Sequence, residues 1–250
     1  MTLTGGSDRN RFEELKALLA GLPDCATVAP LDCRLSGFPS FFPGGPGFCG
    51  SEFPVGGVMF IGNNFGTIEQ YDALPSTVRE FEPEVTKRTE NKTWWDLWYL
   101  VLPESGIPIE RCFFTNAYLG AIVTDPERAA KGKKTRNVGA LRAERAYRSA
   151  CICALAGQVR IAEPHLIVLM GGHAPKAFAQ AFPQFGPFAK GGVAAMQRRQ
   201  PIGGNALALA PELRARVLVL QHPSNPRSDT SKREQGRLLK AAYGAAGVQA

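Results

Sequence analysis

Four short apolar runs, separated by segments of helical character, constrain the fold more than any other feature of this chain. The runs are GVMFIG (57–62), CFFTNAYLG (112–120), HLIVLMGG (165–172) and RVLVLQHPS (216–224). Continuous runs of Val, Ile, Leu and Phe are typical of strands covered on both faces, as in a parallel sheet. The helical segments span residues 92–102, 140–162, 173–182 and 231–247. This alternation predicts an α/β protein, a three-layer α/β/α sandwich with a central, mainly parallel four-stranded sheet.

The length and composition are those of one folded domain. The chain has 250 residues, of which 44% are hydrophobic and 20% charged, enough apolar residues for a substantial core. We expect this core domain over residues 57–250. Residues 1–56, a helix followed by a Phe/Pro/Gly-rich loop, are expected to pack on it.

The N-terminal sequence MTLTGGSDRNRFEELKALLAGL carries charges through its apolar stretch. It is therefore typical of an amphipathic helix and not of a secretion signal. No apolar run approaches the roughly eighteen residues that span a membrane. These features predict a cytoplasmic protein with no membrane partner.

Positive charge is concentrated in three runs. Lys and Arg outnumber Asp and Glu by 29 to 22, which gives a formal net charge of +7. The runs are residues 128–148, the pair Arg198 and Arg199, and residues 227–237. Any one of them alone is typical of a solvated surface, but three in one small domain favour a partner with a phosphate backbone.

Six cysteines occupy positions 25, 33, 49, 112, 151 and 153, and no two form a C-x-x-C pair. Reduced thiols packed as small hydrophobic side chains are the expected state. The alternative is a metal cluster formed by the cysteines at 25, 33 and 49 with one from 151 or 153. We predict neither a disulfide framework nor a metal or other cofactor.

Polar residues follow each apolar run. GNNFGT (62–67) lies at the end of the first run, and Thr115 and Asn116 lie at the end of the second. The third run ends in GGH (171–173), and the fourth ends in HPSNP (222–226). In a parallel sheet these ends meet at one edge, where the ligand sites of α/β folds lie. Each piece alone also fits a structural role, as a turn, a helix start or a buried hydrogen bond.

Taken together and in this order, GNNFG (62–66), the Thr115–Asn116 pair and the H-P-S of residues 222–224 resemble the uracil-DNA glycosylase superfamily. The resemblance covers residues 57–247. It is closest to the mismatch-specific and single-strand-selective branches, whose first motif is G-x-N-P-G. Phe65 stands where those branches have proline, and the C-x-x-C of the iron–sulfur branch is absent.

This resemblance implies roles for the strand-end residues. The catalytic residues would be Asn64, which holds the attacking water, and His222, which donates to the departing base. The amide of Asn116 would read the base, since its donor and acceptor match the edge of uracil and oppose that of cytosine. The residues that would contact the base are Gly62, Asn63, Phe65 and Asn116.

The turn after His222 would contact DNA. Its prolines stiffen it, and a proline wedge with an arginine on the phosphates is an established way to hold a distorted duplex. The residues that would bind DNA are Ser224, Asn225, Pro226 and Arg227.

The resemblance therefore implies a monofunctional DNA glycosylase. It would act as a monomer, without cofactor or metal, on DNA containing uracil or another deaminated base, after flipping that base out of the helix. Two alternatives stay open: a catalytically inactive member that binds DNA or a free base, for which Phe65 is the main indication, and a nucleotide-binding or nucleotide-hydrolysing α/β protein. The preferred base and the preference for single or double strands are not determined by the sequence.

Overall fold

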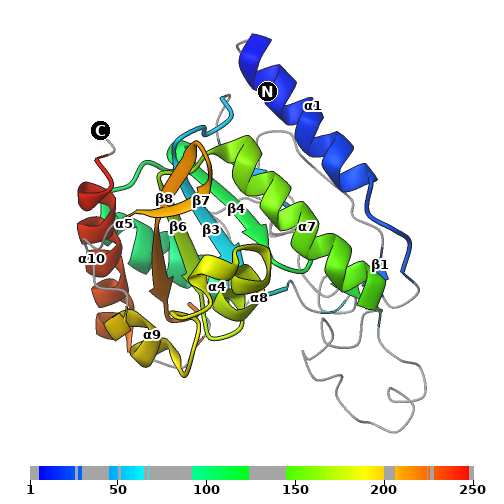
Figure 1. Ribbon diagram of the computed structural model, residues 1–250. Coiled ribbons are helices and arrows are strands. Elements are labelled where there is room, and N and C mark those ends of the chain that lie inside the picture. Colours follow the sequence, from blue (N-terminus) through cyan, green and yellow to red (C-terminus); the bar gives the residue numbers. More distant parts are fainter. Residues whose placement is uncertain are drawn as a thin grey trace, which may run out of the picture.

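A computed structural model of the chain shows a central sheet with helices on both faces (Figure 1). It describes residues 6–25, 28–29, 45–49, 52–64, 67, 92–123, 145–199, 206–223, 225 and 228–247. The predicted α/β sandwich is confirmed.

The main sheet has six strands in the order β2-β4-β3-β6-β8-β7. Its strands are β2 (Gly47–Phe48), β3 (Val58–Gly62), β4 (Cys112–Asn116), β6 (Leu166–Met170), β7 (Leu207–Ala210) and β8 (Leu213–Leu220). The inner four are parallel and match the four predicted runs. The two antiparallel edge strands, β2 and β7, are additions to the predicted sheet.

The edge strands carry little signal in the sequence. The first, β2, has two residues within a stretch rich in Gly and Pro, and β7 is an apolar LALA segment that pairs with β8 through a short hairpin. A second, two-stranded sheet joins β1 (Val28–Ala29) to β5 (Ala121–Ile122). Such pairings depend on which backbone lies nearby, so local patterning does not reveal them.

Alternate side chains of the central strands enter two separate cores. Met59 and Ile61 of β3 belong to one apolar cluster, and Val58 and Phe60 belong to the other. This period of two follows from the pleat of a strand, and every central residue is apolar because both faces are covered.

The first core lies under α7 (Arg145–Ala162), α8 (Ala174–Ala181) and α9 (Val193–Arg199). Outside α7 lies α1 (Gly6–Ala20) (Figure 1). Gly157 of α7 permits this contact, since a Cβ there would meet the side chain of Leu18 at 2.7 Å. Arg11 adds a hydrogen bond to the carbonyl oxygen of Ile161 and an ion pair with Glu163 at 3.1 Å.

The second core lies under α10 (Asp229–Ala245) and a composite helix. The sequence predicts one helix over residues 92–102, but the structure divides it into α4 (Lys92–Asp96), a π-helical turn η1 (Leu97–Val101) and α5 (Leu102–Ser105). Pro103 gives a physical reason. It has no N–H to donate to the carbonyl oxygen of Tyr99, and its ring crowds that carbonyl, so the helix widens in the preceding turn. Two short 3₁₀ turns, η2 (Ile109–Arg111) and η4 (Pro183–Phe185), complete the described elements.

Candidate functional site

The register of the parallel strands places those predicted site residues that the structure describes at or near one edge of the sheet. Asn116 pairs with Gly62, Ile61 pairs with Leu169 on β6, and the next residue of β6, Met170, pairs with Leu220, so this row leads to within two residues of His222. Three strand spacings of about 4.8 Å make this row roughly 14 Å long. The carboxyl ends of β3, β4, β6 and β8 therefore line one edge, as the sequence predicts.

Asn116 fits against β3 because residue 62 is glycine. A Cβ built on Gly62 would overlap the Oδ1 atom of Asn116, and it would make only ordinary contact with the carbonyl oxygen of Thr115 at 3.8 Å. Asn116 is 3% exposed, and its Nδ2 has no hydrogen-bond partner among the described residues. The strand end thus presents a buried N–H donor that is fixed in place but unused.

The loop after β3 continues the pairing beyond the strands. Ala117 N donates to the carbonyl oxygen of Gly62 at 2.9 Å, and Tyr118 N donates to that of Asn63 at 2.9 Å. These bonds hold the first residues of the GNNFG segment against the end of β4.

Asn64 presents a second buried amide donor. Its Oδ1 accepts from Asn63 Nδ2 at 2.7 Å, whereas its own Nδ2 has no partner within the described part of the chain. An unsatisfied buried donor is destabilising by about 1–3 kcal/mol, so native proteins keep few of them without a function. Asn64, two residues after β3, and Asn116, the last residue of β4, place two such donors at the ends of adjacent strands, an arrangement suited to a polar ligand or an ordered water.

Thr115 points to the opposite face of β4. Its hydroxyl donates to Oε1 of Gln158 on α7 at 2.7 Å, and both side chains are fully buried. This bond fixes β4 against α7 just before Asn116. A buried hydrogen bond is the structural role that the sequence also allows for a polar residue at this position.

His222 follows β8 in a half-buried turn. Gly171, with φ of 80°, ends β6 beside it, and a Cβ on that glycine would lie 3.2 Å from the Cβ of His222. Burial lowers the pKa of His222 below its ordinary value of 6.5. The imidazole is therefore neutral at pH 7 and has one N–H to donate.

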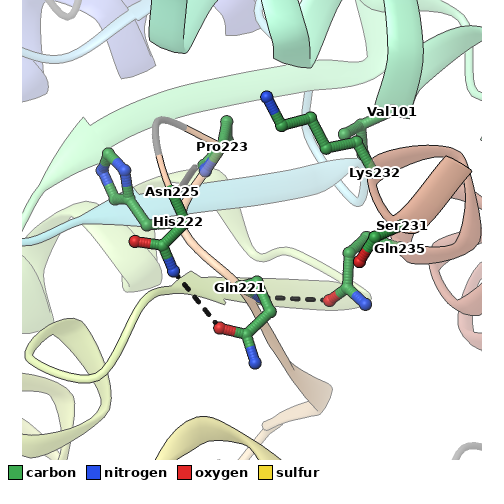
Figure 2. A pocket seen from close by; sticks show the side chains of 8 residues that line it. All are labelled: Val101, Gln221, His222, Pro223, Asn225, Ser231, Lys232 and Gln235. Atoms are coloured by element: carbon green, nitrogen blue, oxygen red, sulfur yellow. Dashed lines mark hydrogen bonds between the residues drawn. The ribbon is translucent and has the colours of Figure 1, made fainter. Parts of the chain in front are cut away.

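A pocket opens between the His222 turn and α10 (Figure 2). It is small, with a cavity volume of about 10 Å³, and is lined by Val101, Gln221, His222, Pro223, Asn225, Ser231, Lys232 and Gln235. Neither Asn64 nor Asn116 lines it. A single ligand site formed by residues 64, 116 and 222 at this edge therefore stays a prediction.

Beside this pocket lies a buried ion pair that the sequence reading missed. The carboxylate of Asp96 is fully buried and accepts from the ammonium groups of Lys232 and, at 3.0 Å, Lys92. It fastens α10 to α4 next to the His222 turn. The one signal in the sequence is an aspartate within the aromatic helix WWDLW.

Four predicted site residues lie outside the described residues: Phe65, Ser224, Pro226 and Arg227. Of the predicted DNA-binding residues, Asn225 is described, and its N–H closes the turn on the carbonyl oxygen of His222 at 3.0 Å. Trp94 of α4 belongs to the core, where it packs on Phe114 at 5.3 Å between ring centroids.

Within the described ranges, no group of three or more His, Cys, Asp or Glu side chains is placed to hold a metal ion. None of the five described cysteines forms a disulfide bond, and Cys33 lies outside this part of the chain. Burial, with a contribution from Glu110, raises the pKa of Cys49 to about 12, and burial also raises that of Cys112. Among the described helices, none has the length and apolar character needed to cross a membrane.

The comparison with protein families matches the Uracil DNA glycosylase superfamily over residues 56–243. This range runs from the residues before β3 almost to the end of α10, and so contains all four strand ends described above. The chain therefore belongs to the uracil-DNA glycosylase superfamily. Among curated proteins, none matches the chain in sequence. Membership supports a glycosylase-type hydrolase that acts on DNA in base repair.

Proposed function

We propose that this protein is a monofunctional DNA glycosylase that hydrolyses the N-glycosidic bond of uracil, or of a related deaminated base, after base flipping. The observation that carries the proposal is the pair of unused, buried amide donors on Asn64 and Asn116 at adjacent strand ends. In a member of this superfamily, such donors suit a flipped base and the water that attacks its sugar. The nearest branches by motif are the mismatch-specific and single-strand-selective ones.

Asn116 would read the base. Its Nδ2 would donate to a carbonyl oxygen of uracil, and its Oδ1 would accept from the imide N–H. Cytosine presents an amino group and an unprotonated ring nitrogen at the same positions, so donor would face donor. The close packing of Asn116 on Gly62 limits rotation of the amide that would otherwise relieve this mismatch.

Asn64 and His222 would serve the reaction itself. When the bond between C1′ and N1 breaks, its electron pair leaves with the base, and negative charge develops on the uracil oxygens. The N–H of neutral His222 would stabilise this charge, while a water held by Asn64 bonds to C1′ and loses its proton to solvent. An amide orients water but is a weak base, so a slower reaction is expected than with a carboxylate at position 64.

The remaining proposed contacts are Gly62, Asn63 and Phe65 with the base, and Ser224, Asn225, Pro226 and Arg227 with the DNA around the gap. The free enzyme would be a cytoplasmic monomer, with residues 1–56 packed on a glycosylase domain of residues 57–250. The contacts follow from the sequence resemblance, and the location and domain bounds follow from the composition and patterning of the chain.

The test is cleavage of oligonucleotides that contain one uracil, followed by alkaline scission of the abasic site. We expect the wild-type protein to cleave, and His222→Ala and Asn64→Ala each to lower the single-turnover rate by about 10²–10³-fold. Asn116→Asp should reduce the preference for uracil over cytosine, since a donor becomes an acceptor. A panel with hypoxanthine and xanthine identifies the preferred base.

An inactive member that binds DNA or a free base is the second candidate, favoured by Phe65 in place of the proline of the first motif. It predicts that the wild-type protein binds uracil-containing DNA without cleaving any base in the panel. A nucleotide-binding protein, in contrast, would show DNA affinity that does not fall as salt rises. Either result would overturn the proposed glycosylase.

A further inference from the structure

Three glutamines tie the end of β8 to the helices on either side of it. Gln197 of α9 donates through Nε2 to the carbonyl oxygen of Val219 at 2.8 Å and to Oε1 of Gln235 at 3.2 Å. The same Oε1 of Gln235, on α10, accepts from the backbone N–H of Gln221 at 3.0 Å. Since β8 ends at Leu220, this side chain supplies the acceptor for the first N–H beyond the strand.

The hydrogen bonds continue into the turn that carries His222 (Figure 2). Oε1 of Gln221 accepts from Nδ2 of Asn225 at 3.4 Å, and Asn225 N donates to the carbonyl oxygen of His222. Figure 2 shows two of these hydrogen bonds, the one between Gln235 and Gln221 and the one between Gln221 and Asn225. Asn225 therefore closes the turn on itself, and Gln235 joins the start of the turn to α10.

Gln235 can serve as a fixed point because α10 itself is held closely. A Cβ on the neighbouring Gly236 would overlap the carbonyl oxygen of Val101 and lie 2.6 Å from the Cβ of Glu104, so α10 packs directly on η1 and α5. The buried pair of Asp96 and Lys232 joins α10 to α4 one turn earlier. The position of Gln235 is thus set by the packing of the second core, not by the turn.

We propose that Gln235 is a positioning residue that holds His222 in its reactive geometry through the backbone of Gln221. This inference depends on the proposed role of His222 in the reaction. A displacement of about 1 Å at a reacting group can lower a rate about 10²-fold, so a side chain that touches no substrate can still control the rate.

Two substitutions at position 235 separate this role from a general effect on stability. Both bonds made by Gln235 are accepted by its Oε1, so Gln235→Glu keeps an acceptor for Gln221 N and Gln197 Nε2. Gln235→Met has a similar length but lacks the oxygen. Gln180→Met, an exposed glutamine on α8, is the matched control.

We expect Gln235→Met to lower the single-turnover rate on uracil-containing DNA by about 10- to 100-fold and to leave the DNA Kd within about twofold. Gln235→Glu should stay within about threefold of the wild-type rate, as should Gln180→Met. If Gln235→Met does not fold, Gln235→Lys provides a second variant without an acceptor at this half-buried position.

The second measurement reads His222 directly. The chain has three histidines, so their imidazole NMR signals can be titrated individually, with His165 and His173 as internal controls. When the turn loosens in Gln235→Met, the pKa of His222 should move up toward 6.5, because the ring becomes more hydrated. Gln235→Glu should leave this titration as in the wild type.

The outcomes distinguish the two proposals. A wild-type protein that cleaves no base, but whose His222 titration shifts in Gln235→Met, removes the proposed function and leaves the positioning of the turn intact. In an active wild type, an unchanged rate or an unchanged His222 titration in Gln235→Met overturns the positioning role. A loss as large in Gln235→Glu as in Gln235→Met also overturns it, since the acceptor oxygen would then not matter.

Discussion

Replacement of Gly62 by alanine tests the geometry on which the base-reading amide depends. The new methyl group would overlap Oδ1 of Asn116, and nothing else described lies closer to it than ordinary van der Waals distance. The Asn116 side chain must therefore move, although it is buried at the end of β4. Forcing an extra methyl into a packed site is typically destabilising by about 1–3 kcal/mol.

For a chain of this length, a loss of about 1–3 kcal/mol corresponds to a Tm lower by roughly 2–12 °C. Because the conflict involves one side chain, Asn116→Ala should remove it, since alanine ends at Cβ. In the Asn116→Ala background we expect Gly62→Ala to be destabilising by less than about 0.5 kcal/mol. Uracil cleavage by Gly62→Ala alone should fall together with its preference for uracil over cytosine.

The assay is urea unfolding of the four proteins in this double-mutant cycle. Gly172→Ala is the control, because no described atom lies within 4 Å of the methyl group it would add. That change should be neutral or stabilising by up to about 1 kcal/mol. An equal loss for Gly62→Ala in both backgrounds would refute the proposed contact with Asn116.

Two further predictions concern buried charge. Asp96→Ala should lower the free energy of unfolding by about 3–5 kcal/mol, because it leaves the buried ammonium of Lys232 without its carboxylate. In urea unfolding, the double variant Asp96→Leu with Lys232→Met should lose clearly less of this free energy, because it removes both charges. An equal loss in the two proteins would contradict this reason. Burial lowers the pKa of His222, so the unfolded chain takes up a proton at higher pH than the folded protein does. The free energy of unfolding should therefore be fully retained above about pH 6.5 and decline as the pH falls through the lowered pKa. The variant His222→Gln should show a smaller decline. Identical pH profiles for the variant and the wild type would count against this role of His222.

The apolar runs were sufficient to predict the four parallel strands. Their side chains are buried on both faces, so each run had to be apolar without alternation, and that signal is local. The polar residues at their ends could also be predicted to meet, since parallel strands in adjacent register bring their carboxyl ends to one edge. Gly62, Asn64, Asn116 and His222 lie at or just beyond these strand ends, whereas their roles in a site stay a prediction.

Other features had no comparable local signal. The π-helical turn before Pro103 and the edge strands β2 and β7 depend on neighbours that periodicity does not identify. The pairing of Asp96 with Lys232 joins residues 136 positions apart. Each arises when two elements meet, so the sequence contains the residues but not their contact.

The sequence by itself determined the class of fold and the chemical groups available at the edge of the sheet, because hydrophobic periodicity and strand-end polarity are properties of short segments. Only the tertiary structure decided that a glycine on β3 makes room for the amide on β4, and that Gln197 and Gln235 from two helices bond to the last residues of β8 and to Gln221, the first residue after it. Those contacts depend on the distance between separate elements, on the scale of the size of one methyl group or the length of one hydrogen bond. Packing at that scale is fixed by the whole chain.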